Sequence, residues 1–197
     1  MPRIAEPREP GRPTTTGQEE RRRAILRAAA RLGGDVGLER VQMSEIAAAA
    51  GVALGTLYRY YPSKHHLYSG VLAAAVAALP PPPQAPGDPV GAVAGFLEHA
   101  VTELLRRPLL GRAMLVSANA VRSAGTVALD TTMRDRILAV AGITDPDAAD
   151  HQLARLAEQC AYGIMTWATA GQLDAEQAAA DMRRACTLLL APWADSR

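Results

Sequence analysis

Residues 51–64 read Gly-Val-Ala-Leu-Gly-Thr-Leu-Tyr-Arg-Tyr-Tyr-Pro-Ser-Lys, and they follow a short run with helical spacing at residues 43–50. Gly51 is the residue type that most readily takes the left-handed conformation that ends a helix. We therefore predict one helix that ends at Gly51 and a second that covers residues 53–60, before Pro62 interrupts the pattern. Two short helices joined through a glycine have the spacing of a helix-turn-helix.

The second of these helices carries side chains that suit a contact with DNA. Thr56 can reach a base edge or a phosphate with its hydroxyl, and Gly55 would let the helix approach a groove closely. Tyr58 and Tyr60 can each donate a hydrogen bond to a phosphate, although core positions are the alternative reading. Residues two apart on a helix diverge by about 200°, so both tyrosines cannot be buried in one face. Lys64 would add a positive charge at the start of the next helix.

Toward the N-terminus, residues 18–32 have helical spacing, with an apolar stripe beside a basic one. Gly33 and Gly34 follow, and we predict that they end this helix. Residues 1–17 hold prolines and three consecutive threonines without apolar periodicity, which is typical of a disordered arm. Two readings stay open for the basic residues, an approach to the DNA backbone or a solvated helix face: Arg21, Arg22, Arg23, Arg27 and Arg31.

The rest of the chain also has helical spacing, so the expected fold class is all-α with about nine helices. Apolar residues make up 49% of the 197, mostly Ala, Leu and Val, and the alternation typical of strands is absent. The predicted domains are a helix-turn-helix domain at 18–65 with a linking helix to 79, a proline-rich connector at 80–89, and a second domain at 90–197. Helices of the second domain are predicted at 90–106, 109–122, 126–141, 146–170 and 174–190.

The charge of the chain is distributed unevenly. Residues 1–80 hold 11 Lys and Arg against 7 Asp and Glu, a net charge of +4, whereas the remainder holds 10 against 13, a net charge of −3. This asymmetry is expected when one half of a chain faces a polyanion. Many solvated surfaces also reach a net charge of +4.

The stretch at 46–64 resembles the signature of the TetR family of one-component regulators, Ile-Ala-x-x-Ala-Gly-Val-x-x-Gly-Thr-Leu-Tyr-x-Tyr-Phe-x-Ser-Lys. Three residues depart from it. Ala53 replaces the usual Ser or Thr cap, which costs roughly 1 kcal/mol. Leu54 stands where many relatives carry a polar or basic DNA contact, and Tyr61 replaces a core Phe, so its hydroxyl needs a partner. At the signature positions this sequence has Ile46-Ala47, Ala50-Gly51-Val52, Gly55-Thr56-Leu57-Tyr58, Tyr60-Tyr61 and Ser63-Lys64, and of these only Tyr61 differs.

Within this family the chain is similar to the KstR-like branch of actinobacterial regulators, which repress steroid and cholesterol catabolism genes and respond to a steroid-CoA intermediate. The similarity weakens across most of residues 115–197, where effector choice is decided. It rests on Val41-Gln42-Met43, on residues 52–64, and on Arg107-Pro108-Leu109-Leu110 with Ala113-Met114.

The resemblance implies a homodimer that binds palindromic double-stranded operator DNA and is released by a small hydrophobic effector, of the steroid-CoA or acyl-CoA type. The DNA contacts are expected from Arg22, Arg23, Gln42, Leu54, Gly55, Thr56, Tyr58, Tyr60 and Lys64. TetR proteins dimerise through their last two helices, which here carry Leu153, Leu156, Cys160, Ile164, Met182 and Leu189. The expected effector contacts are Phe96, His99, Met114, Asn119, Arg122, Met133, Met165 and Trp167, although each type is also common in ordinary cores.

Other functions receive little support from the sequence. There is no phosphate loop, no Gly-x-Ser-x-Gly elbow, no His-Glu-x-x-His and no paired-Cys spacing, so we predict neither an enzyme nor a cofactor. His65 and His66 lack a third ligand nearby, which favours a polar helix start over a metal site. The alternatives within and outside the regulator class are a drug-responsive repressor of an efflux or antibiotic-resistance gene, a ligand-sequestering protein without DNA binding, and an all-α enzyme.

The sequence also favours a cytoplasmic protein without a membrane contact. Cys160 and Cys186 lie in apolar helical stretches, where a free cysteine behaves as a small buried hydrophobe rather than a redox sensor. The polar N-terminus does not have the pattern of a signal peptide. The longest apolar run, at 71–79, is too short to cross a bilayer.

Overall fold

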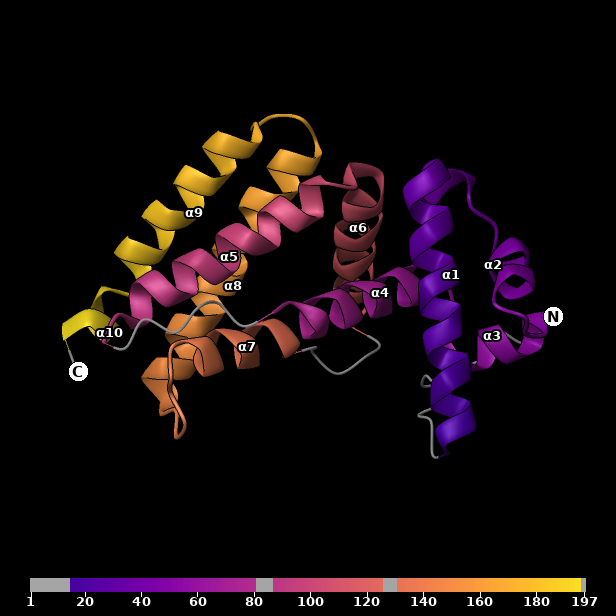
Figure 1. Cartoon of the computed structure of the whole chain (residues 1–197), viewed down its shortest axis with the longest axis horizontal. Helices are drawn as coiled ribbons and strands as arrows, with labels where there is room; N and C mark the ends of the chain where they lie inside the picture. The colour runs from indigo at the N-terminus through magenta and orange to yellow at the C-terminus, as the bar shows by residue number, and fades with distance from the viewer. Residues whose placement is uncertain (1–14, 81–86, 126–130, 196–197) are drawn as a thin grey trace. The chain divides into compact units, whose positions relative to one another are not determined.

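The computed structural model describes residues 15–80, 87–125 and 131–195, and within these ranges the chain is helical with no β-strand. The all-α expectation is therefore confirmed, with ten helices where about nine were predicted. Residues 1–14 of the expected arm and 81–86 of the expected connector lie outside the described ranges. The helices in chain order are α1 (Thr16–Arg40), α2 (Met43–Ala49), α3 (Leu54–Tyr60), α4 (Lys64–Ala78), α5 (Pro89–Leu105), α6 (Pro108–Ala124), α7 (Thr132–Val140), α8 (Ala148–Thr169), α9 (Ala175–Leu189) and α10 (Ala191–Asp195) (Figure 1).

The chain divides into two compact units that are not two consecutive stretches. One unit combines Met1–Ala74 with Leu109–Leu129, and the other combines Ala75–Pro108 with Asp130–Arg197. Nearly all of α6 therefore belongs to the first unit, although it follows the proline-rich connector in the sequence. The division predicted from that connector had placed α6 in the second domain.

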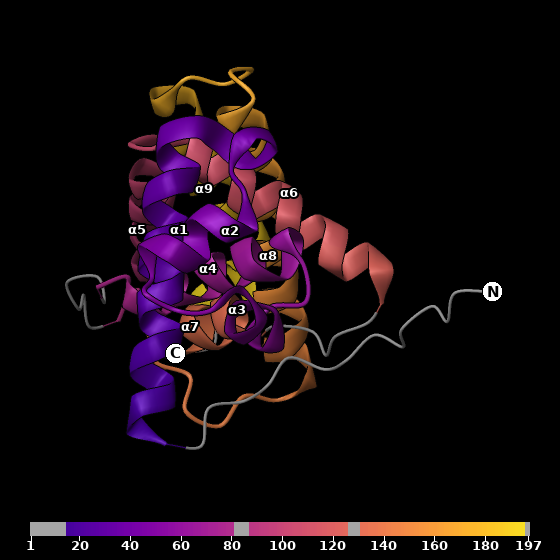
Figure 2. The ribbon, with the colours of Figure 1, turned by 90° about the vertical axis from the view of Figure 1, so that its right-hand side faces the viewer.

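In the first unit, α2 packs against α1 and α3 packs against α2. Figure 2 shows these three helices together. Each contributes large apolar side chains at helical spacing, so that one face of each helix is removed from water. The side chains without measurable exposure include Ile25 of α1, Ile46 of α2, Leu57 of α3, and Leu67 and Tyr68 of α4.

Helix α1 is longer than predicted at both ends. The Thr15 hydroxyl caps its first turn, so Thr16 and Gly17 belong to the helix rather than to an arm. At the other end, the prediction that Gly33 and Gly34 stop the helix is wrong. The helical geometry first breaks at Gly37, whose φ of 79° lies in the left-handed region.

Gly33 instead lets another helix approach α1. A Cβ built on Gly33 would lie 2.5 Å from Cε1 of Tyr68, so only a glycine fits beneath this buried ring. The Tyr68 hydroxyl donates a hydrogen bond of 2.9 Å to the carbonyl of Ala29, one turn earlier on α1. Burial of the phenol raises the pKa of Tyr68 to about 12. A close helix contact, rather than a helix end, therefore explains this glycine.

In the second unit, α5 packs against α9, α8 and α7, and α8 packs against α9 and α7. The inner face of α8 is built mostly from alanine, which allows a close approach of its neighbours. Its buried residues are Ala154, Ala157, Ala161, Met165 and Ala168. At the end of the chain, the Trp193 indole donates a hydrogen bond of 2.7 Å to Asp150, which joins α10 to α8.

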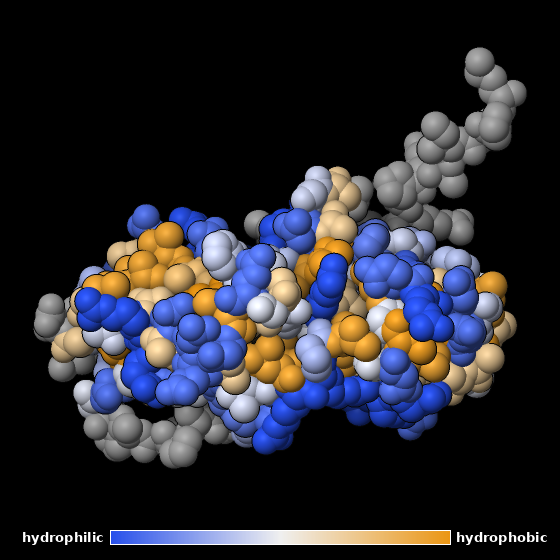
Figure 3. All heavy atoms as spheres, turned by 90° about the horizontal axis from the view of Figure 1, so that it is seen from above, coloured by the Kyte–Doolittle hydropathy of each residue, from blue (hydrophilic) through white to orange (hydrophobic). Residues whose placement is uncertain are grey.

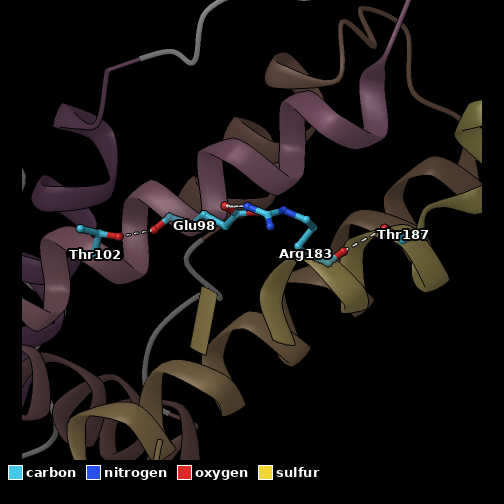
Figure 4. A network of polar contacts seen from close by, with 4 residues as sticks. All are labelled: Glu98, Thr102, Arg183 and Thr187. Carbon is cyan, nitrogen blue, oxygen red and sulfur yellow. Dashed lines mark hydrogen bonds and ion pairs between the residues drawn. The ribbon is translucent and has the colours of Figure 1, made fainter. Parts of the chain in front are cut away.

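An ion pair on the surface of the second unit joins α5 to α9. Arg183 pairs with the Glu98 carboxylate, and the Thr102 and Thr187 hydroxyls donate to backbone carbonyls of the same two residues (Figure 4). Because Arg183 is largely exposed, this pair contributes little to stability. Across the described ranges, no helix combines the length and the apolarity needed to span a membrane.

Candidate nucleic-acid interface

The turn between α2 and α3 has the local structure that the sequence predicts. At the start of α2, the backbone N–H of Gln42 donates to the Glu45 carboxylate at 2.9 Å, as in one half of a capping box. Gly51 has a φ of 66°, which confirms the left-handed residue after α2. Ala53 precedes α3 and makes no capping hydrogen bond with its side chain. The first turn of α3 therefore keeps backbone N–H groups that are open to an acceptor from outside.

One side of α3 is exposed and offers both apolar and polar groups. Leu54 is 42% exposed and Tyr58 is 46% exposed. A Cβ built on Gly55 would meet no atom within 4 Å, so this position is open to a close approach. Thr56 is half-buried, whereas Leu57 on the opposite side is fully buried and holds the helix in place.

The two tyrosines of α3 have different surroundings. Tyr60 is only 3% exposed, and its hydroxyl is buried without a hydrogen-bond partner in the described part of the chain. The prediction that Tyr60 donates to a phosphate is therefore wrong for this structure, because helical geometry points Tyr60 inward when Tyr58 points outward. The ring of Tyr60 contacts the Arg59 guanidinium, at 5.4 Å from the ring centroid.

Tyr61, which stands where the family signature has Phe, is also buried. Its ring packs on Gly70, where a Cβ would lie 2.8 Å from Cε1 of the ring. Burial raises the pKa of Tyr61, and the neighbouring Arg22 guanidinium partly offsets that rise. No residue of the described ranges forms a hydrogen bond with the buried Tyr61 hydroxyl, so the partner that the sequence led us to expect is not found there.

Lys64 already has one partner in the protein. Its ammonium donates a hydrogen bond of 2.9 Å to the carbonyl of Leu38, in the last turn of α1. An ammonium carries three N–H donors, so a second one remains available for a phosphate. The contact also links the beginning of α4 to the end of α1 within the first unit.

The arginines in the first turns of α1 are held by local contacts. Glu19 pairs with both Arg22, at 3.6 Å, and Arg23, at 3.1 Å. Arg21 donates to the carbonyl of Gly17 at 2.9 Å. Exposed pairs of this kind contribute about 0–1 kcal/mol, so a phosphate can replace Glu19 at little cost. The predicted backbone contacts of Arg22 and Arg23 stay predictions, as does that of the exposed Gln42.

The two histidines at the start of α4 contact serine hydroxyls. His65 Nδ1 lies 3.2 Å from Oγ of Ser117, a buried residue of α6. His66 Nδ1 lies 2.8 Å from Oγ of Ser63. Burial, together with the neighbouring His65, lowers the pKa of His66. In the ranges that the structure describes, no three potential ligands gather as a metal site would require.

The predicted effector contacts do not belong to one unit. Phe96, Met114 and Met165 are buried, His99 and Met133 are half-buried, and Asn119 and Arg122 are exposed. Trp167 is 59% exposed on the outer side of α8, so its assignment to a buried effector site is wrong. The contacts on α6 (Met114, Asn119 and Arg122) lie in the first unit, and those on α5, α7 and α8 (Phe96, His99, Met133, Met165 and Trp167) lie in the second.

One residue near these candidates could not be predicted from the sequence. The Arg136 guanidinium of α7 lies over the Phe96 ring, 5.3 Å from its centroid. Arginine is usually a surface residue, and the spacing around Arg136 does not distinguish it from Arg134. Only the packing of α7 against α5 brings the charge to this ring.

The predicted dimer contacts on α8 lie outside the core of the second unit. The alanine face of α8 points inward, and Leu153, Leu156, Cys160 and Ile164 are exposed or half-buried on the other faces. On α9 the prediction is partly wrong. Met182 is buried in the core of the unit and Leu189 is half-buried. Leu188, which was not among the expected dimer contacts, is 61% exposed. Figure 3 shows hydrophobic atoms between hydrophilic ones on the left of the view, the side on which α9 is drawn in Figure 1.

Neither cysteine forms a disulfide. Burial raises the pKa of Cys186 to about 11, and burial also raises the pKa of Cys160. Because the thiolate is the reactive form, both side chains are poor nucleophiles near neutral pH.

Two family models match the chain over most of its length. The model described as bacterial regulatory proteins of the tetR family matches residues 25–71. The model of the tetracyclin repressor-like C-terminal domain matches residues 87–189. Together they span both the helix-turn-helix and the helices that follow the connector.

Among curated proteins, the chain is 34% identical over 145 residues to the HTH-type transcriptional repressor KstR of Rhodococcus jostii, a match that covers 72% of this chain and 68% of the relative. It is 51% identical over 55 residues to KstR of Mycolicibacterium smegmatis, which covers 28% of this chain and 27% of that protein. The second, shorter match has the higher identity.

Solved structures agree with this assignment. The crystal structure of a TetR transcriptional regulator from Rhodococcus sp. RHA1 has a TM-score of 0.79 and 39% identity, and covers 90% of this chain and 98% of that one. The fold of Thermus thermophilus FadR, solved in complex with lauroyl-CoA, is also similar, with a TM-score of 0.61, 20% identity and coverage of 86% and 93%. The chain belongs to the TetR family of bacterial regulatory proteins and is similar to KstR within it.

Proposed function

We propose that this protein is a transcriptional repressor that binds palindromic operator DNA as a homodimer and is released by a small hydrophobic effector. The observation that carries the proposal is the exposed side of α3, where Leu54, the open Gly55 and Tyr58 stand together. Leu57, on the opposite side of α3, is fully buried and holds this helix against the rest of the unit. A short helix with this arrangement can enter a major groove with its first turn.

The contacts divide into those that position the protein and those that read sequence. Tyr58, Lys64 and the arginines of α1 would bind phosphates, which supply affinity without sequence information. Leu54 and Thr56 would meet base edges and thymine methyl groups in the major groove. In a dimer, two copies of α3 would occupy successive major grooves about 34 Å apart, which requires a palindromic site.

Binding of duplex DNA that weakens steeply with salt tests this function. Fluorescence anisotropy with a duplex from the region upstream of the protein's own gene, measured between about 50 and 200 mM salt, should show a loss of affinity of several orders of magnitude. If the purified protein showed no salt-sensitive binding to any double-stranded DNA, the repressor function would be refuted.

The proposed effector is of the steroid-CoA or acyl-CoA type. Support comes from the similarity to KstR and, at the level of the fold alone, from the FadR complex with lauroyl-CoA. Release requires that the effector bind the free dimer more tightly than the operator-bound dimer, by about 1–3 kcal/mol. Equal affinity for both states, measured by calorimetry with and without operator, would contradict this mechanism.

Tyr58→Phe should weaken binding to every operator variant alike, by roughly 30-fold, because the dimer loses two hydrogen bonds to phosphates, one from each subunit, of about 1 kcal/mol each. Tyr60→Phe is the matched control. The Tyr60 hydroxyl is buried without a partner in the described residues, so its removal should leave DNA affinity unchanged. Anisotropy titrations on a panel of single-base operator variants measure both. A change of sequence preference in Tyr58→Phe would exclude the phosphate role.

Lys64→Met should weaken operator binding and also lower the slope of log affinity against log salt by about two, because each subunit of the dimer loses one phosphate contact. The same change removes the hydrogen bond to Leu38, so the free energy of unfolding should fall by about 1 kcal/mol. Salt titrations and urea unfolding separate the two effects. An unchanged salt slope would show that Lys64 only supports α1.

A further inference from the structure

Arg136 is held in the second unit by two contacts that involve no carboxylate. One amino group of its guanidinium donates a hydrogen bond to the carbonyl of Leu79, the residue that follows α4. The guanidinium also lies over the ring of Phe96, at 5.3 Å from its centroid. Phe96 is buried in α5, so the ring offers a fixed apolar platform for the charge.

The charge of Arg136 is not neutralised by the residues that the structure describes. Its near neighbour on α7, Arg134, has a carboxylate partner, since its Nε lies 2.7 Å from the Glu158 carboxylate. Arg136 is half-buried as well, yet no Asp or Glu of the described ranges forms an ion pair with it. The Nε atoms of both arginines are buried without a well-oriented hydrogen-bond acceptor, so the missing carboxylate is what sets Arg136 apart. A cation removed from water without an anion is costly, which favours an anionic oxygen from outside the chain.

The partner that Arg136 has in this structure is a helix end. The last carbonyls of an α-helix have no partner within the helix, and Arg136 satisfies the carbonyl directly after the last turn of α4. Helix α4 begins at Lys64, four residues after α3 ends. A group that drew the guanidinium away would therefore leave the end of this helix without its donor.

We propose that Arg136 binds the acidic oxygen of the effector, and that this exchange of partners withdraws the guanidinium from Leu79 and releases the end of α4. This inference rests on the proposed function and narrows the effector to an amphipathic anion with an apolar body and an oxyanion end. A carboxylate and a phosphate share this chemistry, and both suit a planar guanidinium with several donors.

The test compares acids with neutral alcohols of the same shape. The probes are dodecanoate, lauroyl-CoA and 1-dodecanol, together with a bile acid and the alcohol made by reducing its carboxyl group. Calorimetry on the full chain should show that at least one acid binds about tenfold or more tightly than its alcohol, since a charge-assisted pair is gained. Dodecanoate and lauroyl-CoA separate a carboxylate from the phosphates of the CoA group.

Arg136→Met should reduce the affinity for that acid by about tenfold or more and leave the affinity for the alcohol unchanged. Arg155→Met, which removes an exposed arginine of α8, is the matched control and should bind both probes as the wild type does. Arg136→Lys, which keeps the charge but not the planar donor set, should show an intermediate loss. If circular dichroism shows that Arg136→Met does not fold, Arg136→Lys becomes the decisive variant.

Hydrogen exchange tests the release of the end of α4 independently of ligand affinity. The amides of the last turn of α4 should exchange faster in Arg136→Met than in wild type, and the acid should produce the same change in wild type. The inference is overturned if no acid binds more tightly than its alcohol, or if the Arg136 variants bind acid as well as wild type does. Operator binding is measured in parallel to separate the two hypotheses. If the protein still forms a salt-sensitive complex with the operator, either of these ligand results refutes only the role of Arg136. If no such complex forms, the repressor function itself is refuted.

Discussion

Trp167→Glu should be monomeric at concentrations where the wild type is a dimer, and its affinity for a palindromic operator should fall by at least about 100-fold. Trp167 is 59% exposed on α8, and Leu156 of the same helix and Leu188 of α9 are also exposed. Exposed apolar groups of this size mark interaction sites. In a symmetric dimer each substitution acts twice. A tryptophan at the centre of an interface contributes about 2 kcal/mol or more, so dimer dissociation should increase by roughly 1000-fold.

Val116→Glu is the matched control for this substitution. Val116 is also an exposed apolar residue, but it lies on α6 in the first unit. We expect this variant to remain dimeric, because α6 is not part of the proposed dimer contact. Analytical ultracentrifugation gives the oligomeric state, and thermal unfolding shows that both variants fold. If Trp167→Glu were dimeric and bound the operator as the wild type does, the outer side of α8 would not be the interface.

The sequence shows that α8 carries an apolar stripe, but it does not show which side of the helix faces the core. The large residues on this stripe, from Leu153 to Ile164, were expected as dimer contacts. In the structure the buried face is the alanine face, and the large residues lie mostly outside it. Periodicity measures how apolar a face is, whereas burial depends on how closely the neighbouring helices approach. Small residues allow the closer approach, and a single sequence does not report that distance.

The helix-turn-helix could be predicted because its determinants are local. Gly51 sets the turn through its own backbone conformation, and the spacing of Ile46 and Leu57 sets the buried side. The inward position of Tyr60 and the place of Arg136 over Phe96 depend on contacts between helices far apart in the sequence. The same is true of α6, which belongs to the first unit although it follows the connector. Local patterns contain no information on such pairings.

Gly33→Ala should lower the free energy of unfolding by about 2–4 kcal/mol. The new Cβ would lie 2.5 Å from Tyr68, whose ring is fully buried and whose hydroxyl is bonded to Ala29. Overpacking of a core costs about 1–3 kcal/mol, and loss of a buried hydrogen bond adds about 1–3 kcal/mol. Within a helix, alanine would otherwise be favoured over glycine by about 1 kcal/mol, which offsets part of the cost. Gly95 is at a helical position where a Cβ would meet no neighbour within 4 Å. Gly95→Ala should therefore raise the free energy of unfolding by about 1 kcal/mol.

A double-mutant cycle with Tyr68 separates the close contact from a helix stop. If Gly33 is needed to make room for the Tyr68 ring, Gly33→Ala should lower the free energy of unfolding only slightly, or raise it, in a Tyr68→Leu background. The shorter leucine side chain leaves room for the new Cβ. The two substitutions would then be strongly non-additive, as expected for residues in contact. If Gly33 were needed for a helix end, as the sequence alone suggested, the cost of alanine would be the same in both backgrounds. Urea unfolding of the four proteins distinguishes the two explanations, because a coupling of more than about 1 kcal/mol lies well outside the error of the method.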